Sequence, residues 1–95
     1  MLFVTLTKFK KKADAVAEFG NQLLKNLPDG VKIREIIWTL GQYDSVMIIE
    51  APSEKEIFDM FLHHGGLEYI ETQTLVGMKR EEALKHLQWK ALVDY

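Results

Sequence analysis

The feature that most constrains the fold is a hairpin signature at residues 39–44, which read Thr-Leu-Gly-Gln-Tyr-Asp. It joins one apolar run, residues 31–40, to a second run at residues 46–49. A glycine at the first central position of a two-residue loop favours a type II′ turn, whose twist suits two antiparallel strands. We therefore expect hairpin strands at residues 31–40 and 43–51, in which Asp44 opens the second strand although aspartate is depleted in strands.

Regular apolar spacing on both sides of this hairpin indicates five more elements. A short β-branched run predicts a first strand, apolar residues three and four positions apart predict helices, and alternating threonines predict a last strand. Ser53 and Glu56 have the spacing of a capping box, and the glycines at 65 and 66 form a natural helix end. The expected ranges are 2–7 for the first strand, 13–27 for the first helix, 54–64 for the second helix, 69–76 for the last strand and 79 onward for a terminal helix.

The order of these elements, βαββαβ followed by a helix, predicts an α+β fold. Split βαβ units build a ferredoxin-like plait, in which a four-stranded antiparallel sheet carries two helices on one face. We expect one domain over residues 1–95, with residues 79–95 as a C-terminal helical extension. The strands are apolar on both sides, so the face without helices should be covered by a second copy of the chain or by the terminal helix.

Composition argues against several classes of function. The chain has no cysteine, which excludes disulfides, thiolate metal sites and cysteine nucleophiles and fits a reducing cytoplasm. A net charge of −2 argues against broad nucleic-acid binding. No run is suited to a membrane span or a signal segment, so we expect a cytoplasmic protein without nucleic-acid or membrane partners. The lysines at 8 and 10–12 are expected in a solvated loop, because no glycine-rich phosphate loop accompanies them.

A two-residue turn also determines which residues of the hairpin strands face each other. Glu35 and Glu50 become diagonal neighbours on one face, which also carries Asp44, whereas Trp38 and Tyr43 share the other face. The expected pairs are Leu40 with Tyr43, Thr39 with Asp44, Trp38 with Ser45, Ile37 with Val46, Glu35 with Ile48 and Ile33 with Glu50.

The neighbouring carboxylates of Glu35 and Glu50 are candidate catalytic groups. If their face lines a closed cavity, burial and mutual repulsion would raise the pKa of one of them. A carboxylic acid with a pKa near neutrality can donate or accept a proton in catalysis. The alternative is that both side chains lie at a solvated rim or pair with lysines, since structural ion pairs also shift pKa values.

Thr39 and Asp44 form a second candidate site at the end of the hairpin ladder. We expect a hydroxyl-to-carboxylate contact between their side chains. The pair either stabilises the hairpin, with Asp44 accepting hydrogen bonds from local backbone donors, or holds an amine or hydroxyl group of a ligand beside Gly41.

His63 and His64 are expected at the end of the second helix. Adjacent helical residues point about 100° apart, so the two side chains are poorly placed to share one metal ion, and no metal site is predicted. Either their side chains interact favourably with the negative end of the helix dipole, or one of them ligates iron or haem or acts as a base. Trp38 and Trp89 are expected to anchor the core or an interface.

The hairpin resembles that of the GYD-domain family of small bacterial and archaeal proteins. The likeness rests on Trp-Thr-Leu-Gly-Gln-Tyr-Asp at residues 38–44, Glu-Ala-Pro at residues 50–52 and Glu-Thr-Gln-Thr at residues 71–74, and it extends from the first strand to about Met78. This family is similar to the dimeric α+β barrels, in which two four-stranded sheets face each other. The resemblance therefore implies a homodimer whose bare sheet faces enclose a barrel.

A weaker similarity links the hairpin to the effector-binding domains of Lrp/AsnC-type regulators, which carry a comparable Gly-x-Tyr-Asp hairpin. In those domains the hairpin helps to bind amino acids at subunit interfaces, which implies ligand-binding roles for Gly41, Tyr43 and Asp44. The chain has no DNA-binding helix-turn-helix, so such a role would be that of a stand-alone ligand module.

These observations favour a homo-oligomeric small-molecule-binding domain. In this interpretation Thr39 and Asp44 orient a ligand near the hairpin, Gly41 gives it access to the backbone, and Tyr43 and Trp38 form aromatic walls.

Two alternatives remain open. One is a dimeric-barrel enzyme, either a cofactor-independent oxygenase or isomerase or a haem-dependent enzyme. It would use Glu35 or Glu50 as the acid–base group and His63 or His64 as an auxiliary base or haem ligand. Outside the haem-dependent version no cofactor is predicted. The other alternative is an assembly module whose terminal helix recruits a partner.

Overall fold

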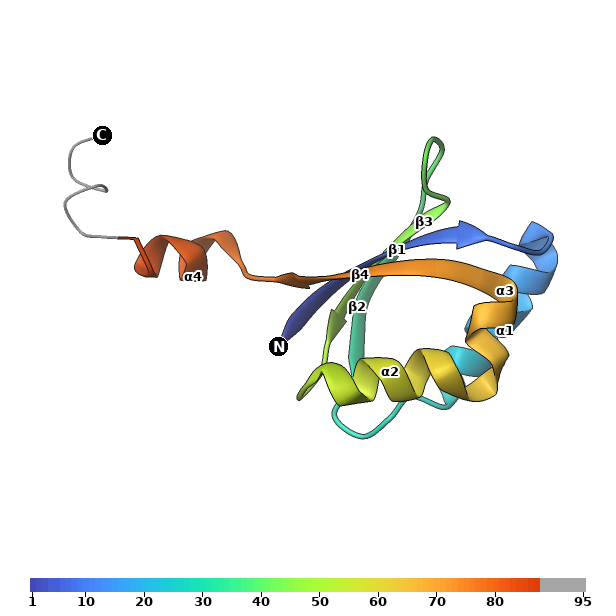
Figure 1. The fold of residues 1–95 in the computed structure, drawn as a ribbon, viewed down its shortest axis with the longest axis horizontal. Helices are drawn as coiled ribbons and strands as arrows, with labels where there is room; N and C mark the ends of the chain where they lie inside the picture. Colours follow the sequence, from blue (N-terminus) through green and yellow to red (C-terminus); the bar gives the residue numbers. More distant parts are fainter. Residues whose placement is uncertain (88–95) are drawn as a thin grey trace.

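The computed structural model describes residues 1–87, apart from the side chain of His64 (Figure 1). Its strands and helices follow the predicted order, with a short additional helix before the last strand. The strands are β1 (Leu2–Phe9), β2 (Lys32–Trp38), β3 (Ser45–Glu50) and β4 (Ile70–Gly77), and the helices are α1 (Ala13–Lys25), α2 (Glu54–Leu62), α3 (Gly66–Tyr69) and α4 (Arg80–Lys85), with a 3₁₀ turn at His63–Gly65.

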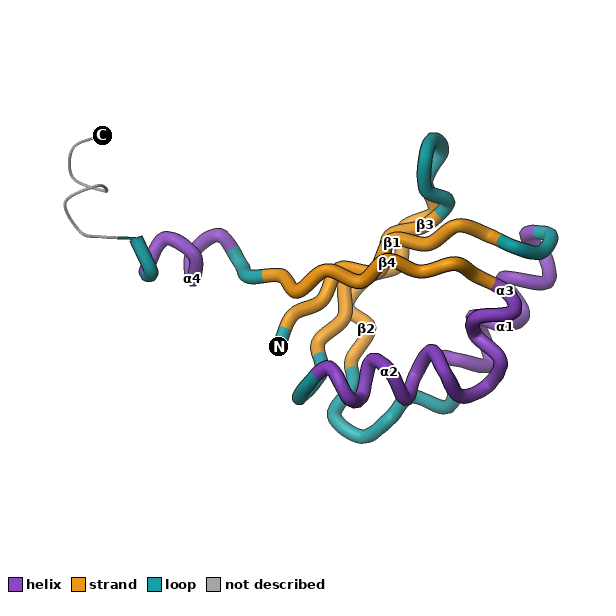
Figure 2. Tube along the Cα trace, viewed as in Figure 1, coloured by secondary structure: helices purple, strands orange, loops and turns teal. Residues whose placement is uncertain are grey.

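The four strands form one antiparallel sheet in the order β2-β3-β1-β4. The helices α1 and α2 lie on the same side of this sheet (Figure 2). This arrangement is the predicted ferredoxin-like plait, and β2 and β4 are its two edge strands. Within residues 1–87, no helix combines the length and the apolar character needed to cross a bilayer.

The helix side of the sheet holds the core. Alternate residues of β1 and β3 are buried there and contact buried side chains of α1 and α2. Burying one such apolar side chain fully stabilises a fold by about 1.5–3 kcal/mol. Hydroxyl groups in this layer are paired, since Thr7 Oγ1 bonds to Ser45 Oγ and Thr5 Oγ1 lies 2.9 Å from Thr74 Oγ1. The main core residues are Phe3, Met47, Ile49 and Ile70 from the sheet and Val16, Phe19, Leu23, Ile57, Met60 and Phe61 from the helices.

The other side of the sheet, called the open face below, carries Val4, Leu6, Ile37 and Ile48. These side chains are half-buried or exposed, and no helix within residues 1–87 covers them (Figure 1). The helix α4 lies beyond the end of β4, and none of its residues is buried. The sequence analysis expected either a second chain or the terminal helix to cover this face. The described part of the terminal helix does not cover it.

The strand β2 contains a bulge that the sequence interpretation did not include. Arg34 is an extra residue between Ile33 and Glu35, whose partners on β3 are adjacent to each other. The predicted register is therefore confirmed from Glu35 to the end of β2 but is wrong before the bulge, where Lys32 and not Ile33 lies opposite Glu50. Because a bulge shifts the preceding residues by one position, Ile33 packs against the core.

The connection between the hairpin strands is wider than the predicted two-residue turn. Residues 39–44 all lie outside β2 and β3, so Asp44 precedes its strand and does not open it. The Thr39 N–H still donates to the Asp44 carbonyl at 2.8 Å, but the Thr39 hydroxyl donates to the Tyr43 carbonyl, also at 2.8 Å. Side chains that bond the backbone in this way compete with the ladder. Gly41 has a φ of 133°, a conformation that favours glycine, within this looser loop.

Candidate functional site

Asp44 fastens the hairpin loop to the end of β1. Its N–H donates to the Thr7 carbonyl at 2.8 Å, and its Oδ2 accepts a hydrogen bond from the Phe9 N–H, also at 2.8 Å. The expected contact between the hydroxyl of Thr39 and the Asp44 carboxylate is wrong, because each group has a backbone partner of its own. The Asp44 carboxylate thus supports the hairpin by accepting a backbone N–H, although the donor belongs to another strand.

Tyr43 and Trp38 lie on opposite sides of the sheet, contrary to the expectation that they share a face. Trp38 is on the helix side, where it meets Phe9 edge-to-face with 5.0 Å between the ring centres. Tyr43 reaches over the open face, where its hydroxyl donates to Gln73 Oε1 at 2.7 Å. The Lys8 ammonium lies 5.7 Å from the centre of the Tyr43 ring. The loop explains the separation, since its residues do not continue the alternation of a strand.

A small hollow of about 80 Å³ opens on the open face beside Tyr43. Pairing of β1 with β4 places Lys8 opposite Glu71 and Leu6 opposite Gln73, so a cation, an anion and an amide meet there. The sequence interpretation missed this cluster, because it ended the first strand at residue 7 and placed Lys8 in a loop. The alternation of side chains between the two faces of β1 continues through Lys8 and Phe9. This alternation is the sequence signal that would have extended the predicted strand.

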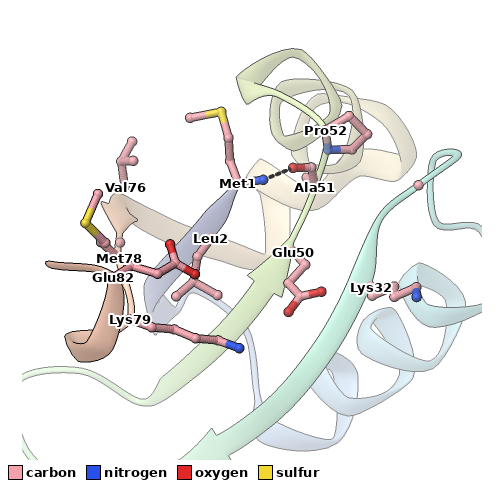
Figure 3. Close-up of a pocket in the computed structure, with 12 residues that line it drawn as sticks. Met1, Leu2, Lys32, Glu50, Ala51, Pro52, Val76, Met78, Lys79 and Glu82 are labelled. Atoms are coloured by element: carbon pink, nitrogen blue, oxygen red, sulfur yellow. Dashed lines mark hydrogen bonds between the residues drawn. The ribbon is translucent and has the colours of Figure 1, made fainter. Parts of the chain in front are cut away.

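A larger hollow of about 660 Å³ lies at the opposite end of the sheet (Figure 3). Its walls come from the start of β1, the end of β3 and the segment that joins β4 to α4. Figure 3 shows the Lys79 ammonium directed toward the side of the hollow where Glu50 lies, with Leu2 nearby. At the rim the Met1 amino group donates to the Ala51 carbonyl at 2.6 Å. Of the candidate site residues whose side chains the structure describes, only Glu50 lines this hollow.

Glu50 forms an ion pair with Arg34, whose Nη2 lies 2.6 Å from Glu50 Oε2. The hydrogen bond from Arg34 lowers the pKa of Glu50, partial burial acts in the opposite direction, and the positive charges of Lys79 and Lys32 lower it further. In the single chain the pKa of Glu50 is thus lowered, and the rise expected for a carboxylate in a closed cavity stays a prediction for an assembly that closes this face. Pairing with a basic side chain describes it better, and Glu35 is exposed on the open face.

A family model for the GYD domain matches residues 4–87 of the chain. The chain belongs to the GYD-domain family. The match confirms the resemblance carried by the hairpin, and it continues past Met78, where the likeness was expected to end. The helix α4 is therefore part of the region that this GYD domain shares with its family.

Among solved structures, the crystal structure of FFRP-DM1 is similar to this GYD domain, with a TM-score of 0.55 and 18% sequence identity. The alignment covers 82% of this chain and 100% of the other chain. At this identity the likeness shows the fold alone, and at that level it supports the weaker resemblance to Lrp/AsnC-type effector-binding domains. No curated protein is significantly similar in sequence to the chain.

In this GYD domain, His63 and His64 follow α2 and are not part of it. The helix stops at Leu62, and His63 begins the 3₁₀ turn with its side chain exposed. The side chain of His64 and all of Trp89 lie outside the described residues. The roles expected for His63 and His64, as base or haem ligand, remain predictions.

The Arg34–Glu50 ion pair predicts a pH-dependent stability. A carboxylate whose pKa is lowered in the folded protein adds stability above its unfolded pKa, and this contribution is lost as the pH falls through the folded value. We expect Arg34→Gln to unfold at a lower urea concentration than the natural protein at neutral pH. The difference should shrink below about pH 4, near the ordinary pKa of glutamate. Because the pair is largely exposed, the difference should be small and should decrease in salt.

Urea unfolding at neutral and acidic pH measures this difference. Lys25→Gln is the control, because it removes one positive charge from the exposed end of α1, where Lys25 forms no ion pair within the described residues. Its effect should not disappear at acidic pH. A difference for Arg34→Gln that persists in acid would mean that Arg34 stabilises the fold through packing and not through the charge of Glu50.

Proposed function

We propose that this GYD domain is a homo-oligomeric small-molecule-binding domain whose ligand lies beside the hairpin on the open face. The observation that carries this proposal is the polar cluster at the small hollow, where Lys8, Tyr43, Glu71 and Gln73 meet beside an apolar surface. Binding sites combine a mainly apolar surface with a few convergent polar groups. The cluster itself is mostly polar and supplies such groups, and the neighbouring apolar residues of the open face supply the apolar surface. As the composition predicts, we expect the protein to act in the cytoplasm.

The cluster is suited to a small molecule that carries both an acidic and an amino group. Lys8 offers an ammonium group to a carboxylate, and Glu71, opposite on β4, offers a carboxylate to an amine. Neither side chain forms an ion pair within residues 1–87, with the other or with a third residue. The ring of Tyr43, held by its hydrogen bond to Gln73, provides a flat wall. A free amino acid is the simplest molecule with these groups.

Association of two chains would complete the site. The hollow of about 80 Å³ is well below the roughly 300–1,000 Å³ of typical ligand pockets. A second sheet packed on the open face would add a wall to it and would also cover Val4, Ile37 and Ile48. Removal of this apolar surface from water provides the driving force, at roughly 25 cal/mol per Å².

The hairpin residues then have different roles from those that the sequence predicts. Asp44 and Thr39 shape the loop through their backbone contacts, and Gly41 supplies its positive φ. Among the hairpin residues predicted to bind the ligand, Tyr43 is the one that contacts it. Trp38 is on the other side of the sheet and is not one of its walls.

Thermal unfolding in the presence of each natural amino acid tests this function. A ligand that binds only the folded protein stabilises it, by about 2.7 kcal/mol at 100 times its dissociation constant. We expect at least one amino acid to raise the melting temperature of the natural protein. Lys8→Met should abolish this rise, whereas Lys11→Met, which removes the same charge from the exposed segment before α1, should retain it.

Two results would contradict the proposed function. One is the absence of a rise with every amino acid, and the other is an equal loss of the rise in Lys8→Met and Lys11→Met. Native mass spectrometry of the natural protein should also show an assembly of at least two chains. A mass of one chain at working concentrations would contradict the oligomeric part.

A further inference from the structure

We propose that the C-terminal arm of one chain docks into an apolar groove on the helix side of a second chain. The C-terminal arm is the segment that follows β4, residues 78–87 in the described structure. The groove, called the α2/β4 groove, runs between α2 and the edge strand β4 and has a volume of about 400 Å³. It lies on the opposite side of the sheet from the open face, so this contact does not depend on the ligand site proposed above.

The α2/β4 groove has the composition of a surface that binds an apolar helix face. Phe58 and Leu62 lie four residues apart on α2 and are 65% and 60% exposed. Val76 of β4, which lines the groove with them, is 65% exposed, and Leu67 is also exposed. A contiguous apolar surface of this kind marks an interaction site, and a groove between a helix and a strand suits the helix-in-groove mode of recognition.

The C-terminal arm supplies a helix that residues 1–87 of its own chain do not bury. None of the six residues of α4 is buried, and Leu87, just after it, is 50% exposed. A helix of this length is marginal in water on its own, since isolated helices need roughly 12–15 residues. We therefore expect α4 to pack against another surface. Leu84 and Leu87 are three residues apart, and the Leu87 N–H donates to the Leu84 carbonyl at 3.2 Å, so the two leucines lie on one side of the arm.

The direction of the C-terminal arm favours a second chain as the partner. Lys79 has a φ of −63° and a ψ of 145°, so the backbone continues in an extended conformation after β4. The helix α4 consequently lies beyond the end of the sheet and well apart from α2 (Figures 1 and 2). A symmetry-related chain can place its groove on this arm and insert its own arm in return, which gives a closed, self-complementary contact.

The charges of the two surfaces are complementary. Arg80, Leu84 and Leu87 are spaced by four and three residues, so the arginine lies on the apolar side of the C-terminal arm. Glu54 lines the α2/β4 groove at the start of α2. Neither Arg80 nor Glu54 forms an ion pair within residues 1–87. An apolar helix side with an arginine at its beginning therefore matches an apolar groove with a glutamate at one end.

Because the chain has no cysteine, engineered disulfides test this contact directly. Isotope-labelled Leu84→Cys protein is mixed with unlabelled Leu62→Cys protein and mildly oxidised, and the mixed disulfide dimer is identified by its mass. The control replaces the second protein by Leu24→Cys, which carries its cysteine at an exposed leucine of α1, away from the α2/β4 groove. We expect about ten-fold or more mixed dimer with Leu62→Cys, because docking raises the effective concentration of the two thiols.

Three results would overturn this inference. The first is a greater yield of mixed dimer with Leu24→Cys than with Leu62→Cys. The second is a disulfide within one chain in the double variant L62C/L84C. The third is the absence of mixed dimer although the circular dichroism of both proteins matches that of the natural protein. Phe58→Glu in the Leu62→Cys protein should reduce the yield while the melting-temperature response to amino acids is retained. If amino acids no longer raise the melting temperature but the mixed dimer still forms, the result would count against the ligand site and not against the docked arm.

Discussion

Val4→Glu should weaken association through the open face while the fold of each chain persists. Val4 is in the central strand β1 on the open face, between its partners Ile48 of β3 and Leu75 of β4. In a dimer closed through this face, the glutamate would be buried among apolar side chains without a partner. Because an unpaired buried charge costs several kcal/mol, we expect the dissociation constant to rise by about 100-fold or more, which corresponds to about 2.8 kcal/mol.

Sedimentation over a dilution series measures this change. Leu24→Glu introduces the same charge on α1, away from both the open face and the α2/β4 groove, and should keep the natural mass. Circular dichroism shows whether each variant is folded. A folded Val4→Glu protein with the natural mass and the natural dissociation constant would contradict association through the open face.

Local sequence patterns predict most of this fold. The spacing of Val16 and Leu23 predicts a helix, and both residues are buried in the core as that pattern requires. The bulge at Arg34 was missed, although it leaves a trace in the sequence. Ile33 and Ile36 are three residues apart, and an unbroken strand would put them on opposite faces. Both lie on the helix side because an extra residue is inserted between them.

The candidate site was harder to predict, because it depends on contacts between distant parts of the chain. Tyr43 bonds Gln73, thirty positions away, and Lys8 reaches the same ring from β1. The pairing of Lys8 with Glu71 exists only once β4 has joined the sheet beside β1. A pattern within one hairpin contains no information on these partners. The hairpin likeness indicated this loop but not the side of the sheet on which each of its side chains lies.

Asp44→Ala should lower the melting temperature of the ligand-free protein. The Asp44 carboxylate accepts the Phe9 N–H at 2.8 Å, and this bond ties the loop to β1. Loss of a hydrogen bond to a charged group costs about 1.5–3 kcal/mol. For a domain of this size the melting temperature should fall by roughly 4–8 °C per kcal/mol. Asp29→Ala, at an exposed aspartate of the turn before β2, should change stability by no more than about 0.5 kcal/mol.

Asp44→Asn separates the structural role of this side chain from a role in ligand binding. The amide oxygen of asparagine can still accept the Phe9 N–H, so most of the stability should be retained. The NH₂ group then replaces the second carboxylate oxygen, which is the atom left to accept an amine of a ligand. If Asp44 only anchors the loop, the Asn variant keeps the amino-acid response of the natural protein. If the side chain also binds the ligand, that response is lost at nearly natural stability. A natural melting temperature for ligand-free Asp44→Ala would contradict the anchoring role itself.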